Sequence, residues 1–281
     1  MRTPVIDFHI HPICYEKYCF SSEEWIKQRH QKSDEEWQDF IKYYSEPYNF
    51  TQYLRDNGVD YGIILAELSP ITTGICPNEY VAGFTRGQDR LIPFASLNPF
   101  LIGNPRQELS RLVSENGFRG LKIYPTYHYF YPNDRLLYPI YAKAEELQIP
   151  VMVHTGSSVF RGARLEYGDP LFLDDVAVDF PGIQIVLVHS GRGFWYNHAF
   201  FLASLHSNIY MEVAGLPPQK LLHYFPELER NADKIIFGSD WPGVTSIRSN
   251  IETLRELPLE SSTKEKILGG NADRILKLKD C

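Results

Sequence analysis

Val5-Ile6-Asp7-Phe8-His9-Ile10-His11 is an apolar stretch that ends in two histidines, and the same pattern returns three more times along the chain. Later runs of this kind are Val151-Met152-Val153-His154, Ile185-Val186-Leu187-Val188-His189 and Ile235-Ile236-Phe237-Gly238-Ser239-Asp240. Polar residues that close buried runs make little sense as packing. They are typical of ligands gathered at one end of a parallel barrel, where the carboxyl ends of the strands converge.

Eight apolar runs of strand length are spaced along the chain as the strands of such a barrel would be. They begin near Val5, Tyr61, Leu91, Phe118, Val151, Ile183, Ile209 and Ile235. After the first interval, the starts are 26 to 33 residues apart, which is the length of one strand, one helix and two loops. Helix patterns lie at residues 50–57, 105–116 and 136–148.

These spacings predict an α/β fold of the (β/α)8 (TIM) barrel type, formed by residues 1–281 as a single domain. An open, doubly wound sheet is the main alternative fold. It is disfavoured because no glycine-rich phosphate-binding turn follows the first apolar run.

An aromatic-rich insertion separates the first two runs. The interval between their starts is 56 residues, and residues 13–47 account for the excess. Its aromatic residues include Tyr15, Tyr18, Trp25, Trp37, Tyr43 and Tyr44. Because the insertion follows the histidine pair, one interpretation is a helical lid over the substrate pocket, and the other is a peripheral insertion or oligomer contact.

Charge and cysteine content exclude several classes of protein. The chain has 28 Lys and Arg against 35 Asp and Glu, a net charge of −7, and no basic run, which argues against a nucleic-acid partner. The cysteines (Cys14, Cys19, Cys76 and Cys281) form no CxxC motif, which favours free thiols in a reducing compartment. A strand is predicted within five residues of Met1, and no apolar run approaches the ~20 residues of a membrane span. We therefore expect no signal peptide and no membrane contact, and a cytoplasmic protein that acts on a small molecule, with a homodimer as the commonest assembly.

The histidines are concentrated at the predicted strand ends. His9 and His11 are two residues apart, so both project from one face of a regular strand. Strand ends make up roughly a tenth of a barrel, so about one of the nine histidines is expected there by chance, whereas four are found. Imidazoles and carboxylates are ligands of zinc, which keeps an open coordination position in catalytic sites.

In these motifs the chain resembles the amidohydrolase superfamily, and within it the amidohydrolase-2 group that includes aminocarboxymuconate-semialdehyde decarboxylase. The resemblance rests on Asp7-Phe8-His9-Ile10-His11-Pro12, His154, His189-Ser190-Gly191, Gly238-Ser239-Asp240-Trp241-Pro242 and Ile267-Leu268-Gly269-Gly270-Asn271-Ala272. Each motif is weak alone, but together, in this order and one per expected strand, they are specific.

The resemblance implies that His9, His11, His154 and Asp240 hold one divalent metal, with zinc expected first and manganese, iron or cobalt as alternatives. His189 is then the general acid/base beside the metal, and Asp240 both binds the metal and accepts a proton from its water. The chemistry agrees, because a metal-bound water has a pKa near 7 and imidazole moves protons near that pH.

Three further residues are candidates for substrate binding. Lys122, in Gly120-Leu121-Lys122-Ile123-Tyr124-Pro125, has three open roles: a cation that binds an anionic substrate, a carboxylated lysine that bridges a second metal, as in the binuclear branch of the superfamily, or a lysine paired with a carboxylate. Arg192 and Trp195 follow His189 and are expected above the metal, where Arg192 either binds a substrate carboxylate or ties the loop to the lid. Glu67, Asn98 and His128 are further candidates for the pocket wall.

These expectations lead to three hypotheses of function. The first is a metal-dependent hydrolase that uses metal-activated water on a small amide, lactone or related carboxylated compound. The second is a metal-dependent, non-oxidative decarboxylase. The third, from another class, is a metal-stabilised binding protein without catalysis.

Overall fold

The computed structural model describes residues 2–14 and 19–278, and its centre is a nearly closed barrel of eight parallel strands. Neighbouring strands follow one another in chain order: β1 (Ile6–Ile10), β2 (Tyr61–Leu65), β5 (Leu91–Ser96), β6 (Leu121–Ile123), β7 (Val151–Gly156), β8 (Ile185–Arg192), β9 (Ile209–Glu212) and β10 (Ile235–Ile236). The amide of Phe8 donates to the carbonyl of Phe237 at 3.0 Å, which joins the first strand to the chain after the last. Each strand begins within three residues of its predicted start, so the (β/α)8 barrel is confirmed.

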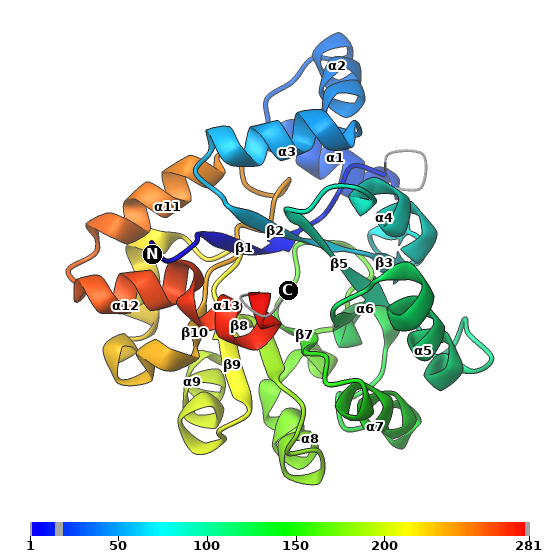
Figure 1. Ribbon diagram of the computed structural model, residues 1–281, viewed down its shortest axis with the longest axis vertical. Coiled ribbons are helices and arrows are strands. Elements are labelled where there is room, and N and C mark those ends of the chain that lie inside the picture. Colours follow the sequence, from blue (N-terminus) through cyan, green and yellow to red (C-terminus); the bar gives the residue numbers. More distant parts are fainter. Residues whose placement is uncertain (1, 15–18, 279–281) are drawn as a thin grey trace.

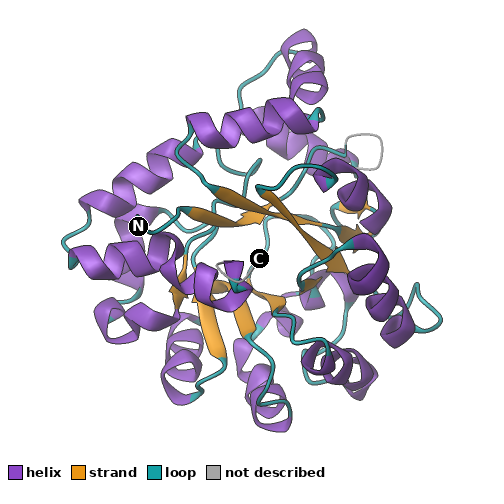
Figure 2. Cartoon of the chain, viewed as in Figure 1, coloured by secondary structure: helices purple, strands orange, loops and turns teal. Residues whose placement is uncertain are grey.

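Helices surround this barrel on the outside (Figure 2). They are α1 (Phe20–Arg29), α2 (Asp34–Tyr44), α3 (Pro47–Asp56), α4 (Asn78–Thr85), α5 (Pro105–Asn116), α6 (Pro125–His128), α7 (Tyr138–Glu146), α8 (Leu173–Asp179), α9 (Tyr196–Leu205), α10 (Leu221–Tyr224), α11 (Ile247–Glu256), α12 (Ser261–Glu265) and α13 (Asn271–Leu276). The prediction for residues 105–116 matches α5, which ends at Gly117 with a left-handed φ of 75°. Among the described residues, each helix is too short or too polar to cross a lipid bilayer.

Apolar side chains fill the interior of the barrel. Phe8 and Phe94 meet edge to face there, with ring centroids 5.5 Å apart, among Ile63, Val186 and Ile236. Helix α13 adds Ala272, Ile275 and Leu276 to the same cluster and lies over the middle of the barrel (Figure 1). Helix α13 closes one end of the barrel, and the polar residues that end the strands lie at the opposite end.

A β-bulge in β1 allows this strand to serve both the core and the polar end. Asp7 pairs with Gly62 and Ile10 pairs with Ile64, so three steps along β1 match two along β2. Ile6 and Phe8 lie in the barrel interior, and regular alternation would turn His9 away from it. The extra residue changes the alternation, so that His9 and His11 both line the cavity described below.

The insertion after β1 forms α1 and α2. Tyr15 and Tyr18 lie outside the described residues. On α1, Ser22, Trp25 and Ile26 line the cavity at the polar end of the barrel. On α2, Trp37 stacks on Phe40 at 5.1 Å, and Phe40 stacks on Trp241 at 6.0 Å, outside that cavity. Only α1 therefore has the position of a lid, and its function as one stays a prediction.

A short antiparallel hairpin follows β2 and was not predicted. It consists of β3 (Glu67–Ser69) and β4 (Gly74–Cys76). The hairpin places Glu67 and Thr73 at the cavity, beside the histidine pair.

Candidate metal centre

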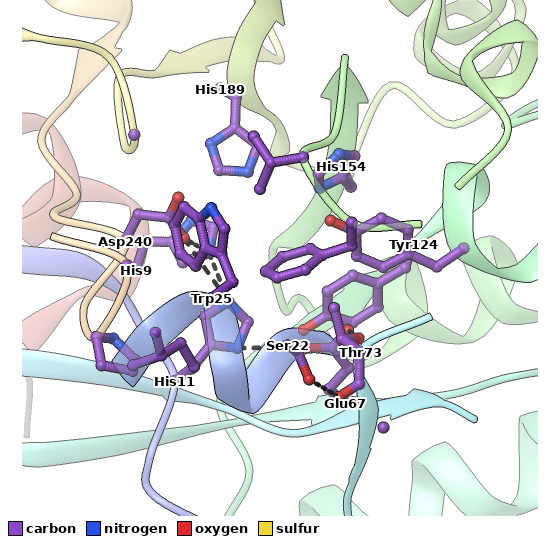
Figure 3. A pocket seen from close by; sticks show the side chains of 18 of the residues that line it. His9, His11, Ser22, Trp25, Glu67, Thr73, Tyr124, His154, His189 and Asp240 are labelled. Carbon is purple, nitrogen blue, oxygen red and sulfur yellow. Dashed lines mark hydrogen bonds and ion pairs between the residues drawn. The ribbon is translucent and has the colours of Figure 1, made fainter. Parts of the chain in front are cut away.

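A cavity of about 420 Å³ opens at the carboxyl ends of the strands. Four histidines and one aspartate from four separated segments line it (Figure 3): His9, His11, His154, His189 and Asp240. The structure therefore brings together all five residues that the sequence predicts for the metal and its acid/base. Their roles stay predictions.

The tightest group in the cavity is His9, His11 and Asp240. The Nε2 atoms of the two histidines are 3.1 Å apart, and Asp240 Oδ1 is 3.4 Å from His9 Nε2 and 3.9 Å from His11 Nε2. Ligand atoms about 2.1 Å from a tetrahedral zinc ion are roughly 3.4 Å from one another. These separations fit one ion bound by all three residues.

The protonation state of the histidines also favours the binding of a metal ion. Burial lowers the pKa of His11 to about 3, and it lowers the pKa values of His9 and His154 well below the usual 6.5, with the charge of Lys122 adding to each shift. A metal ligand must be a neutral imidazole. The site therefore holds these histidines in the form that binds metal at neutral pH.

His154 completes the predicted ligand set from the opposite wall. Its Nε2 is buried and has no hydrogen-bond partner in the part of the chain that the structure describes. Its ring centroid is 4.8 Å from that of His189 and 4.9 Å from that of Tyr127. A buried nitrogen without a partner is costly, and a cation in the cavity removes that cost.

His189 is held in one orientation. Its Nδ1 is 2.8 Å from the carbonyl oxygen of Ala214, which can only accept a hydrogen bond, so Nδ1 carries the proton and Nε2 is free. The backbone of His189 is left-handed, with φ 60°, as is that of Asp240 at 70°. Such conformations cost on the order of 1–3 kcal/mol each and are concentrated at functional sites.

Three cationic side chains line the same cavity, Arg29 on α1 and, nearer the histidines, Lys122 and Arg192. Lys122 is fully buried, its Nζ has no hydrogen-bond partner among the described residues, and burial lowers its pKa to about 8. Arg192 donates to the carbonyl of Ser157 at 2.9 Å, and its second terminal nitrogen is 3.9 Å from Asp240 Oδ2. The Lys122 Nζ lies 4.9 Å from the centroid of the Tyr124 ring, so its three N–H groups remain available to an acceptor in the cavity.

Aromatic rings form the rest of the wall. Trp25 of α1 meets Phe160 edge to face at 5.4 Å, and Phe160 meets Tyr127 at 6.4 Å. All three residues line the cavity, and Trp25 faces into it (Figure 3). These rings give the cavity an apolar side.

Three candidates lie elsewhere. Trp195 is not among the residues that line the cavity: the chain turns away at Gly191 and Gly193, and the Trp195 ring packs edge to face on Phe194 at 5.4 Å. Asn98 donates to the carbonyl of Leu68 and accepts from the amide of Phe100. His128 is buried against Ser69, with 3.2 Å between Nε2 and Oγ. The last two contacts are structural.

Sequence reasoning missed one buried acid. Glu212 closes β9, its Oε1 is 3.3 Å from His9 Nδ1, and its Oε2 accepts the backbone amide of His189 at 3.1 Å. Burial raises its pKa to about 8. Ile209-Tyr210-Met211-Glu212 is an apolar run closed by a polar residue, so the signal that identified the histidines was present here too.

Comparison with known proteins places the chain among relatives of similar length. The family model described as amidohydrolase matches residues 6–278. Gamma-resorcylate decarboxylase of Rhodococcus jostii (strain RHA1) is 26% identical over 243 residues, which cover 68% of this chain and 71% of that protein.

Solved structures share the fold. An uncharacterised TIM-barrel protein from Bordetella bronchiseptica superposes with a TM-score of 0.79 at 21% identity, over 99% of both chains. The 2,6-dihydroxybenzoate decarboxylase from Rhizobium superposes with a TM-score of 0.67 at 20% identity, over 99% of this chain and 100% of that one.

These findings correct the order of the functional hypotheses. Hydrolysis was expected first, because a metal ion held by such ligands commonly activates a water molecule as a nucleophile. Relatives that match over about two thirds of the chain are named decarboxylases, so the first expectation was wrong. A ligand set specifies the metal, whereas the rest of the cavity decides which bond breaks.

Proposed function

This chain belongs to the amidohydrolase family, and from that membership we propose that it is a metal-dependent, non-oxidative decarboxylase of small, planar carboxylic acids. Support comes from the decarboxylase named among its relatives and from the chemistry of the cavity. The hydrolase hypothesis is set aside. The proposed ligands are His9, His11, His154 and Asp240, around one divalent ion.

One observation carries the proposal: the group of metal-binding side chains shares one cavity with a buried lysine, Lys122, whose Nζ makes no hydrogen bond to the described residues. A buried ammonium without hydrogen bonds is costly, and a substrate that accepts them lowers this cost. Arg192 brings a second positive charge into the same wall. A substrate carboxylate is a chemical match for both, because it accepts charge-assisted hydrogen bonds from each.

Each part of the cavity then has a task. A bound divalent ion supplies Lewis acidity, which polarises an oxygen atom of the substrate. Lys122 and Arg192 bind and orient the anionic groups. Trp25, Phe160 and Tyr127 contact the faces of a flat ring and keep bulk water out.

The reaction needs one proton transfer. The bond between the ring carbon and the carboxylate carbon breaks, CO2 leaves, and the electron pair stays on the ring carbon, which must then bind a proton. Asp240 and His189 line the cavity and are placed to pass that proton on. Because Nδ1 of His189 donates to Ala214, its Nε2 carries no proton, so His189 would first take a proton from water or from a hydroxyl of the substrate and then give it to the ring carbon.

The ligand atoms limit which metal ion the site can bind. Three imidazoles and one carboxylate suit zinc, and also manganese, iron or cobalt. A second ion bridged to the first by Lys122 would require that lysine to be carboxylated, and the proposal assigns it to the substrate instead. We also infer a single domain and a homodimer, which light scattering coupled to size exclusion can measure.

The test uses the protein reconstituted with Mn²⁺ or Zn²⁺ and a panel of hydroxylated benzoates labelled with ¹³C in the carboxyl group, in D2O. We expect labelled CO2 and a product with one deuterium at the vacated carbon. The metal-free protein is the control and should release none. Uptake of ¹⁸O from water into an amide, lactone or alkene panel, without release of CO2, would contradict the proposal.

A further inference from the structure

Two buried glutamates lie beside the histidine pair, one for each ring. Glu212 Oε1 is 3.3 Å from Nδ1 of His9, and Glu67 Oε2 is 3.4 Å from Nδ1 of His11. They come from opposite sides of β1, since Glu67 follows β2 and Glu212 closes β9. In each ring, Nδ1 faces a carboxylate, and Nε2 faces the cavity group that includes Asp240.

At His9 the contact joins two buried polar atoms. Nδ1 of His9 and Oε1 of Glu212 are 3.3 Å apart, and neither has a hydrogen-bond partner among the described residues. Each therefore suits the other as a partner, while the charge of Lys122 also acts on Glu212. If Nδ1 of His9 carries a proton, that proton is directed to a carboxylate, and the lone pair remains on Nε2.

Glu212 is held in place from several directions. Its Oε2 accepts the amide of His189, and its backbone carbonyl accepts the hydroxyl of Ser190 at 2.9 Å. Gly238 makes room for it, because a Cβ at that position would lie 1.9 Å from Glu212 Oε1. Glu212 is also absent from the residues that line the cavity, so it lies behind His9 and out of reach of the substrate.

Glu67 is held by the hairpin. The hydroxyl of Thr73 donates to its Oε1, which leaves Oε2 facing His11. The hairpin that follows β2 therefore has a function beyond closing the cavity, since it brings both Thr73 and Glu67 to the ring of His11.

We propose that Glu212 and Glu67 are positioning residues that keep His9 and His11 in the tautomer with Nε2 free, so that both rings are preset for the metal. Neither acid is assigned as a ligand. The inference rests on the metal centre of the proposed function. Carboxylates behind metal-bound imidazoles raise the basicity of the ligand, and their loss costs about 10- to 100-fold in metal affinity.

The experiment measures Co²⁺ and Zn²⁺ affinity by competition with a chromogenic chelator, with no substrate present. Glu212→Gln keeps an oxygen acceptor but removes the charge, and about a 10-fold loss of affinity is expected. Glu212→Leu removes both, and about a 100-fold loss is expected. Glu67→Gln should resemble Glu212→Gln. Glu108→Gln, at an acid that pairs with Arg111 on the surface, is the matched control and should bind as the unmodified protein does.

Two further readouts separate positioning from simple support of the fold. The d–d spectrum of the Co²⁺ form should shift in Glu212→Gln, because the field of the His9 nitrogen weakens. The metal-free Glu212→Gln protein should melt no lower than the unmodified protein, since a buried unpaired carboxylate oxygen is removed.

Two outcomes would overturn the inference. One is a metal affinity within twofold of the unmodified protein in both Glu212→Gln and Glu67→Gln, together with an unchanged d–d spectrum in Glu212→Gln. The other is a second ion per chain that is lost when Glu212 is replaced. One nitrogen of His9, one nitrogen of His189 and one oxygen of Glu212 also lie within 4.8 Å of one another, so Glu212 would then be a ligand. Because no substrate is used, failure of the decarboxylase proposal leaves this test intact.

Discussion

The Nε2 atoms of His9 and His11 lie 3.1 Å apart at the mouth of the barrel. Two neutral imidazoles at this distance share one hydrogen bond, which requires that one of them carry its proton on Nε2. The carboxylates behind the rings favour the proton on Nδ1 in both. The two demands conflict in the metal-free protein, and a cation between the nitrogens resolves the conflict.

Removal of metal should therefore destabilise the protein. An ion present at 100 times its Kd adds about 2.7 kcal/mol to the free energy of unfolding, which corresponds to roughly 5–10 °C in Tm for a chain of this size. Calorimetry before and after dialysis against a chelator measures the difference, and added Zn²⁺ or Mn²⁺ should restore it. In His11→Ala the difference should vanish. If elemental analysis verifies that the metal has been removed and the Tm is still unchanged, the result would argue against the proposed metal centre.

Lys122→Met should separate function from stability. The change removes a buried ammonium without a hydrogen-bond partner among the described residues, so Tm should stay level or rise. A charge-assisted contact to the substrate is worth about 1.5–3 kcal/mol, so kcat/KM should fall roughly 10- to 100-fold. The control is Lys266→Met, at a half-buried lysine that pairs with Asp233 outside the cavity, and it should retain full activity. An Lys122→Met enzyme with unchanged kcat/KM would remove Lys122 from the substrate site.

Gly238→Ala tests how tightly the centre is packed. The added Cβ would lie 1.9 Å from Glu212 Oε1 and 2.8 Å from the Cβ of His9, so one of the two must move. We expect a loss of about 1–3 kcal/mol in the free energy of unfolding together with weaker metal binding. Gly83→Ala, in α4, has no atom within 4 Å of the new Cβ and should be neutral or stabilising. Equal effects of both substitutions in denaturant titrations would contradict this account.

His189→Asn addresses the hypothesis of a binding protein without catalysis. The proposed role of His189 is proton transfer, so kcat should fall by about 100-fold or more, whereas metal content measured by elemental analysis should remain unchanged. If the protein only binds its ligand, His189→Asn should change neither the turnover of the substrate panel nor the metal content. Loss of metal together with activity would instead make His189 a ligand.

The barrel, and the meeting of the histidines and Asp240 at one cavity, could be predicted from the sequence because both depend on short apolar runs that end in a polar residue. Each strand is a continuous apolar run, and His154 and Asp240 mark where two such runs end. The bulge in β1 could not be predicted in the same way, since it depends on which residue of β2 pairs with Ile10. Trp195 was misplaced because its position depends on the left-handed turns at Gly191 and Gly193. Register and loop conformation are properties of the assembled fold.

The lid hypothesis is tested by two tryptophans of the insertion. Trp25 lines the cavity and touches Phe160, so Trp25→Ala should raise KM about 10-fold through lost ring contacts worth roughly 1.5 kcal/mol, with little change in Tm. Trp37 is 2% exposed and packs on Phe40, outside the cavity, so Trp37→Ala should cost about 3–5 kcal/mol of stability while KM stays close to normal at low temperature. Steady-state kinetics and thermal melts of both variants decide between the interpretations. If Trp25→Ala changes neither KM nor kcat, α1 is a peripheral insertion rather than part of the substrate site.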